Sequence, residues 1–185
     1  SDVCSSDLGE ARPGGSEEVA APARAQAKAR AEFEEATRPT GNPITDRLSA
    51  RLRRDYEGAV REYATLPDSR GGVVLNTDVA RELSPDYLAD RTRSADVHEP
   101  SSAFIKRMYA DRLGAPTPEG RQRRVMFTAG GTGAGKTTAE RAMGDHLGKP
   151  EIVYDTNMNR LGSSVEKIDQ ALAARSEEHT SELQS

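Results

Sequence analysis

A glycine-rich stretch behind a short apolar run is the feature that most constrains this chain. Residues 130–138 read GGTGAGKTT and fit the pattern G-x-x-x-x-G-K-[ST]. Residues 124–129 (RVMFTA) before them are typical of a strand, and residues 137–147 after them repeat apolar side chains at helical spacing. Strand, glycine loop and helix in this order predict an α/β fold built on a parallel sheet.

The glycine loop has the composition that phosphate binding needs. Glycines allow several backbone N–H groups to point into one concavity, and the following helix adds the positive end of its dipole. Lys136 would reach the β- and γ-phosphates of a nucleotide, and Thr137 would offer its hydroxyl to Mg²⁺. A turn that only links a strand to a helix needs neither side chain. We therefore predict a phosphate-binding loop made of Gly130, Gly131, Thr132, Gly133, Ala134, Gly135, Lys136, Thr137 and Thr138.

The two ends of the chain resemble a translated sequencing adapter. Residues 1–8 (SDVCSSDL) and 175–185 (RSEEHTSELQS) correspond to the two strands of one common oligonucleotide. We treat both segments as artefacts and leave them out of the fold prediction. We therefore expect residues 9–174 to be an internal piece of a longer protein, with only the first part of the nucleotide-binding domain present.

Without these ends the chain carries no net charge. The full sequence has 26 Lys and Arg against 30 Asp and Glu, and the ends hold one of the former and five of the latter. A basic nucleic-acid-binding surface is therefore not expected. Cys4, the only cysteine, lies in the first end, which excludes disulfides and thiolate metal sites elsewhere. Because the sequence contains no long apolar run, we expect no membrane span and a cytoplasmic location.

The first region after the adapter-like start is poor in large apolar side chains. Residues 9–43 are rich in Ala, Glu and Arg, and within them residues 19–36 have helical propensity. Phe33 is almost the only large apolar residue in that stretch. Without a face to bury, we expect a flexible or solvated helical arm.

Residues 44–122 are predicted to form a helical lead-in to the central strand. Amphipathic helices are expected over residues 44–64 and 101–113. The predicted buried face of the first consists of Leu48, Leu52, Tyr56, Ala59, Val60 and Tyr63. Residues 76–78 (NTD) follow a short β-like run and echo residues 155–157 (DTN), an echo that the preference of helix starts for such residues explains. His98 and Glu99 suit either proton handling or capping and loop hydrogen bonding, and we favour the latter.

Residues 123–174 are predicted to be the N-terminal part of a P-loop NTPase-type domain, with a truncated parallel sheet. Residues 151–154 (EIVY) form its second predicted strand, and a helix is expected to follow up to residue 174. Asp155 and Asn157 come directly after that strand. Because chemistry in open α/β sheets collects at the carboxyl ends of the strands, both are candidate site residues.

These features together resemble the zeta-toxin family of P-loop kinases. The resemblance covers roughly residues 73–174 and depends on residues 129–138 and on their spacing to residues 152–157. It implies ATP and Mg²⁺ as ligands, phosphoryl transfer to a small acceptor such as UDP-N-acetylglucosamine, and an antitoxin protein as partner. By this resemblance Lys136 is the phosphate lysine and Thr137 the Mg²⁺ ligand.

The chain departs from the family at the catalytic base. The family has an aspartate two residues after an earlier aspartate; here the earlier position is Asp155 and the base position is Asn157. An amide cannot take a proton, so Asn157 can orient an acceptor but cannot deprotonate it. Either Asp155 takes over that role, or the acceptor differs, or the protein is a nucleotide-dependent ATPase or binding module that acts on a partner protein. The fragment alone is expected to be inactive.

Overall fold

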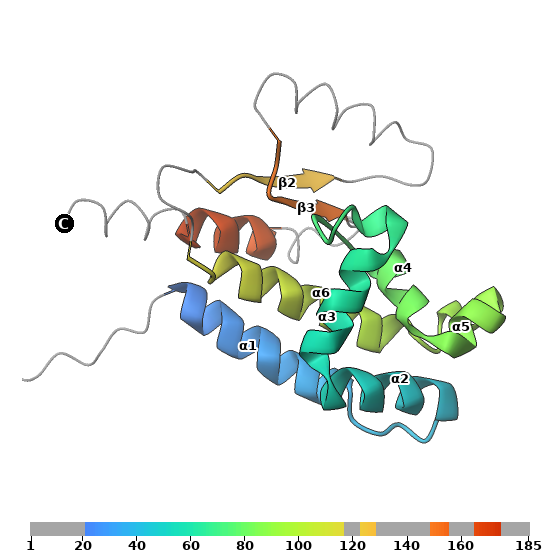
Figure 1. The fold of residues 1–185 in the computed structure, drawn as a ribbon. Coiled ribbons are helices and arrows are strands. Elements are labelled where there is room, and N and C mark those ends of the chain that lie inside the picture. Colours follow the sequence, from blue (N-terminus) through green and yellow to red (C-terminus); the bar gives the residue numbers. More distant parts are fainter. Residues whose placement is uncertain (1–20, 117–122, 129–148, 156–164, 175–185) are drawn as a thin grey trace, which may run out of the picture.

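The computed structural model describes residues 21–116, 123–128, 149–155 and 165–174. These residues form a mixed α/β structure that is mostly helical and contains a small parallel sheet (Figure 1). The glycine loop at 130–138, the helix expected at 137–147, Asn157 and both adapter-like ends lie outside the described residues.

Most of the described chain is helical. The last described residues, 165–174, form a helix. The remaining helices, in chain order, are α1 (Ala21–Ala36), α2 (Pro43–Arg54), α3 (Tyr56–Thr65), η1 (Pro67–Ser69), α4 (Thr77–Ala80), η2 (Arg81–Leu83), α5 (Pro85–Ala89), η3 (Arg91–Ser94) and α6 (His98–Leu113).

The sheet has three strands, β1 (Val74–Asn76), β2 (Val125–Thr128) and β3 (Ile152–Asp155), in the order β1-β3-β2. Both pairs are parallel, as the strand–loop–helix pattern predicts. The central strand β3 is apolar and buried from Ile152 to Tyr154, as is typical of a parallel strand covered on both faces. Since β1 comes from the predicted helical lead-in, residues 44–122 and 123–174 share one sheet.

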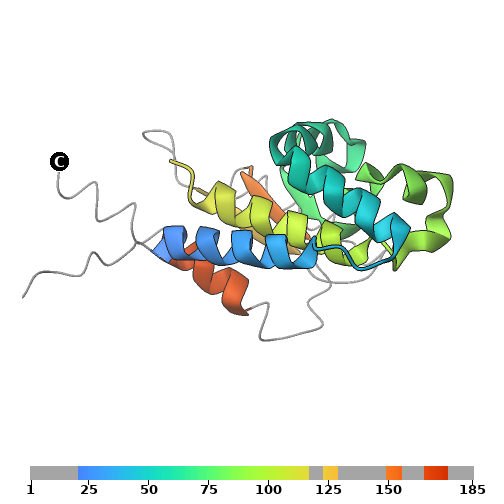
Figure 2. The same cartoon turned by 90° about the horizontal axis from the view of Figure 1, so that it is seen from below.

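Helix α6 packs against the sheet and links it to the other helices. Figures 1 and 2 show α1 alongside α6, with the helical residues 165–174 next to both. The ring of Tyr109 in α6 lies 4.8 Å from that of Tyr154 and 6.3 Å from that of Phe127, measured between centroids. Its hydroxyl donates a hydrogen bond of 2.7 Å to the carbonyl of Lys167. One aromatic residue therefore ties α6 to two strands and to the last described helix.

Within the region predicted as a flexible or solvated helical arm (residues 9–43), residues 21–36 are helical as expected, but α1 also buries part of one face, which the prediction did not include. Along Ala21–Ala36 the side chains of Ala29 and Phe33 are buried, and Phe33 is only 1% exposed. The Phe33 ring packs edge-on against Tyr56, with 5.7 Å between centroids. Small alanine side chains permit close helix–helix approach, because interaxial distance depends on the residues at the contact. Phe33 therefore packs on α3, while Arg30 of α1 pairs with Asp111 of α6 at 3.5 Å.

The single helix expected over residues 44–64 is two helices that meet at Asp55. Asp55 has φ −144° and ψ 72°, which ends α2, and its side chain accepts a 2.8 Å hydrogen bond from the Gly58 N–H at the start of α3. The predicted buried face is largely confirmed, since Leu48, Leu52 and Tyr63 are each at most 2% exposed. Asp55 is a good N-cap residue, and its local hydrogen bond competes with helix continuation.

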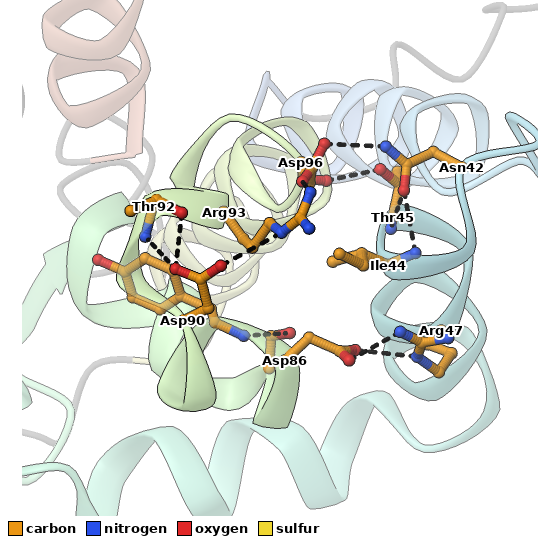
Figure 3. A network of polar contacts seen from close by, with 11 residues as sticks. Asn42, Ile44, Thr45, Arg47, Asp86, Asp90, Thr92, Arg93 and Asp96 are labelled. Carbon is orange, nitrogen blue, oxygen red and sulfur yellow. Dashed lines mark hydrogen bonds and ion pairs between the residues drawn. The ribbon is translucent and has the colours of Figure 1, made fainter.

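The start of α2 is fixed to the segment before α6 by a polar network (Figure 3). The side-chain oxygen of Asn42 accepts hydrogen bonds from the N–H groups of Ile44 and Thr45, and its amide nitrogen donates to Asp96 at 2.9 Å. The Thr45 hydroxyl donates to the Asp96 carbonyl at 2.6 Å. Asn42 therefore has two tasks: it caps a helix and binds a carboxylate.

Within the part of the chain that the structure describes, no helix combines the length and the apolar character needed to cross a membrane.

Candidate functional site

Three polar side chains meet where the strands of the sheet end. Because the strands are parallel, their carboxyl ends lie at one edge, and the register places both Asn76 and Thr128 opposite Asp155. The Asn76 side-chain nitrogen donates to Asp155 Oδ2 at 2.7 Å, and the Thr128 hydroxyl donates to Asp155 Oδ1 at 2.8 Å. We call Asn76, Thr128 and Asp155 the strand-end cluster. It holds a half-buried carboxylate by both of its oxygens.

The strand-end cluster is adjacent in sequence to both predicted parts of the nucleotide site. Thr128 ends β2 and is followed, after Ala129, by the glycine loop at 130–138. Asp155 ends β3 two positions before Asn157. Asp155 therefore occupies the strand-end position that the residue pattern predicts, and its catalytic role stays a prediction.

Asn76 uses both ends of its side-chain amide. The oxygen accepts hydrogen bonds from the backbone N–H groups of Asp78 at 2.6 Å and Val79 at 3.3 Å, which caps α4. The nitrogen is the group that donates to Asp155. Helix capping therefore explains only half of what this residue does.

The backbone of β1 is held at the strand-end cluster by Tyr63. The phenol donates a 2.8 Å hydrogen bond to the Val74 carbonyl and accepts one of 3.0 Å from the Asn76 N–H. Tyr63 is fully buried, and burial raises its pKa to about 12, which keeps the hydroxyl protonated and able to donate. A side chain of α3 thus replaces a neighbouring strand along the outer edge of β1.

The strand-end cluster presents one carboxylate, that of Asp155, in a fixed orientation. The Asp155 carboxylate accepts hydrogen bonds from the amide of Asn76 and the hydroxyl of Thr128, which fix its orientation. Carboxylate and hydroxyl oxygens are the groups that Mg²⁺ prefers, usually one or two carboxylates together with phosphate oxygens. Among the described residues, no group of three or more His, Cys, Asp or Glu side chains is arranged to hold a metal ion.

Several predicted site residues cannot be placed relative to this cluster. Lys136, Thr137, the rest of the loop from Gly130 to Thr138, and Asn157 lie outside the described residues, and their roles stay predictions. Asn76 and Thr128, in contrast, were not predicted as site residues. The available signal was that a polar residue ends each of three strands, but only the pairing register shows that these residues meet.

His98 is accounted for by local hydrogen bonding. Its Nδ1 lies 2.8 Å from Nη2 of Arg81, and Arg81 also pairs with Asp78 at 3.1 Å. His98 begins α6, three residues before the predicted start, but the capping residue Val97 makes no side-chain cap. Loop hydrogen bonding, one of the two expected roles, is therefore the one that the contacts support.

An open depression of about 430 Å³ lies at the C-terminal ends of α1 and α2, and it is lined by Phe33, Glu34, Arg38, Arg53 and Arg107. The Arg107 guanidinium lies 3.6 Å from the centroid of the Tyr56 ring and 4.9 Å from that of Phe33, so it packs as part of the helix interface. Basic side chains at helix C-termini offset the negative end of the helix dipole. Helix packing and compensation of the helix dipole therefore account for these arginines, and the strand-end cluster remains the better candidate for a functional site.

Comparison with known proteins adds no assignment: no protein-family model matches the chain, and no curated protein matches it.

Proposed function

We propose that this protein is a P-loop NTPase-type kinase that binds ATP·Mg²⁺ and transfers the γ-phosphoryl group to a small acceptor. The observation that supports the proposal most directly is the hydrogen bond from the Thr128 hydroxyl to the Asp155 carboxylate. It connects the strand that leads into the glycine loop with a carboxylate at the end of the neighbouring parallel strand. Ligands of open α/β sheets bind at this edge, beyond the carboxyl ends of the strands.

Each part of the proposed site has a distinct task. The loop at 130–138 would bind the phosphates, with Lys136 on the β- and γ-phosphates and Thr137 on Mg²⁺. Bound Mg²⁺ would neutralise phosphate charge. Asp155, with Asn157 nearby in sequence, would orient the acceptor hydroxyl. The bond from the γ-phosphorus to the bridging oxygen breaks, a bond to the acceptor oxygen forms, and the hydroxyl proton leaves to Asp155 or to water.

The acceptor class follows from the resemblance to zeta-toxin-like kinases and is a UDP-N-acetylsugar such as UDP-N-acetylglucosamine. The presence of Asn157 at the base position favours a second candidate, a nucleotide-dependent ATPase or binding module that acts on a partner protein. Phosphoryl transfer depends mostly on positioning and charge neutralisation, so the amide does not by itself exclude kinase activity. Mass spectrometry separates the two, because only the kinase yields a phosphorylated sugar nucleotide from ATP.

The binding step is tested by replacing the phosphate lysine. Lys136→Ala removes a charged donor worth about 1.5–3 kcal/mol, so we expect affinity for Mg²⁺·ATP to fall about 10- to 100-fold by titration calorimetry. Lys149→Ala is the matched control, because Lys149 is an exposed lysine ahead of the amino end of β3, opposite the proposed site. Equal affinity of the wild-type protein and Lys136→Ala would refute the proposal, and so would an equal loss in both variants.

A further inference from the structure

We propose that Asn76 is a positioning residue that fixes the orientation of the Asp155 carboxylate, so that the lead-in strand β1 is part of the site. This inference rests on the proposed function for its catalytic meaning. Its geometric basis is independent of that function. Three observations carry it: the orientation of the Asn76 amide, the use of both Asp155 oxygens, and the anchoring of β1 by Tyr63.

The orientation of the Asn76 amide follows from its neighbours. Its oxygen faces two backbone donors, the N–H groups of Asp78 and Val79, while its nitrogen faces an acceptor, Asp155 Oδ2. A flipped amide would place NH₂ against two N–H groups and a carbonyl oxygen against a carboxylate. Both contacts would be repulsive. The side chain therefore has one satisfied orientation, in which it donates to Asp155.

The Asp155 carboxylate is held from both sides of its strand. Asn76 on β1 binds one oxygen, and Thr128 on β2 binds the other. Rotation of the carboxylate out of this plane would break both hydrogen bonds at once, so the two donors select one side-chain rotamer. Phosphoryl transfer gains most of its acceleration from positioning and electrostatics, and small misplacements of a reacting group are costly. Removal of one donor should therefore affect turnover more than substrate binding.

The residues that hold Asn76 in place include one outside the sheet, Tyr63 of α3. Tyr63 accepts a hydrogen bond from the backbone N–H of Asn76 and donates one to the Val74 carbonyl, which fixes the strand that carries the Asn76 side chain. A continuous set of contacts therefore runs from α3 through β1 to Asp155. The lead-in region, which the sequence predicts as helical apart from one short β-like run, supplies one of the groups that orient the candidate catalytic residue.

The chain contains a matched control for this inference. Asn42 also caps a helix with its side-chain oxygen and donates its amide nitrogen to an aspartate, Asp96, at 2.9 Å (Figure 3). Serine is as good an N-cap as asparagine but is too short to keep the bond to the aspartate. Asn76→Ser and Asn42→Ser therefore remove the same contact, one at the strand-end cluster and one between α2 and the segment before α6.

The test compares kinetics in the complete natural protein, since the fragment alone is expected to be inactive, and side-chain order in this chain. With Mg²⁺·ATP as probe, we expect Asn76→Ser to lower kcat at least about 10-fold with KM for ATP within about 2-fold of wild type. Asn42→Ser should leave both parameters unchanged, while the two variants lose similar thermal stability. A fall in kcat equal in both variants, or no fall in Asn76→Ser, would overturn the inference.

A second measurement does not depend on turnover. Three-bond scalar couplings measured by NMR in the nucleotide-free protein report the χ1 rotamer of Asp155. We expect a single rotamer in the wild type and in Asn42→Ser, and averaged couplings in Asn76→Ser. A single rotamer in all three proteins would overturn the positioning role. If the wild-type protein does not bind ATP, the proposed function fails, and these couplings still decide whether Asn76 orients Asp155.

Discussion

Removal of the Tyr63 hydroxyl tests how much its two hydrogen bonds to the backbone of β1 stabilise the protein. In Tyr63→Phe the ring and its packing remain, but the Val74 carbonyl and the Asn76 N–H each lose their partner. The bond to the Val74 carbonyl is buried, and the bond from the Asn76 N–H is half-buried. An unsatisfied buried polar group costs about 1–3 kcal/mol, and solvent relaxation around the less buried Asn76 N–H lowers the total. We expect a loss of about 2 kcal/mol in the free energy of unfolding.

Urea denaturation followed by circular dichroism measures this loss, and a thermal melt should show a fall of about 4–8 °C. Tyr154→Phe is the control, because Tyr154 is also buried but its hydroxyl makes no hydrogen bond within the described residues. It should change stability by less than about 0.5 kcal/mol. A cost below that value for Tyr63→Phe, or an equal cost for both variants, would contradict the role assigned to the Tyr63 hydroxyl.

Two further predictions concern backbone geometry and alkaline pH. Gly72 has φ +82° and a Cβ there would lie 2.8 Å from Nη2 of Arg112, whereas Gly71 has φ +71° and open space. The Arg112 guanidinium is the end of a flexible side chain and can move aside, so the positive φ dominates at both positions. Gly71→Ala and Gly72→Ala should each cost about 1–2 kcal/mol in chemical denaturation, and a cost below about 0.5 kcal/mol at either position would refute this argument. Burial raises the pKa of Tyr63 and of Tyr154 to about 12, above the value of about 10 in an unfolded chain. Their contribution to stability is complete below pH 10 and is lost as pH rises from 10 to 12. The free energy of unfolding, measured by denaturation at several pH values in this window, should therefore fall less with pH in Tyr63→Phe or Tyr154→Phe than in the wild type.

Much of the local structure can be predicted from the sequence, because it depends on neighbouring residues. The apolar runs in β2 and β3, the polar residue that ends β3, and the buried face around Leu48 and Leu52 follow from the sequence pattern. The break at Asp55 was missed because the apolar pattern continues across it. The capping of α3 by this residue therefore prevails over the amphipathic pattern.

Features that depend on distant contacts could not be predicted. The burial of Phe33 requires the faces of α6 and α3, which lie far away in sequence. The strand-end cluster depends on register between strands that are 27 and 79 residues apart at their bonded side chains. A single sequence gives the ends of strands but not their partners, so Asp155 could be predicted as a site residue while Asn76 and Thr128 could not.

The most direct test of the account is an NMR titration of the full chain with Mg²⁺·ATP, in which the backbone amides of the described residues serve as probes. We predict saturable shifts at Asn76, Thr128 and Asp155, and none around the depression lined by Phe33 and Arg107. These shifts should be absent at the same nucleotide concentration in Lys136→Ala. Saturable shifts confined to the depression, or no saturable shift in the wild-type protein, would contradict the claim that this edge of the sheet is a nucleotide site.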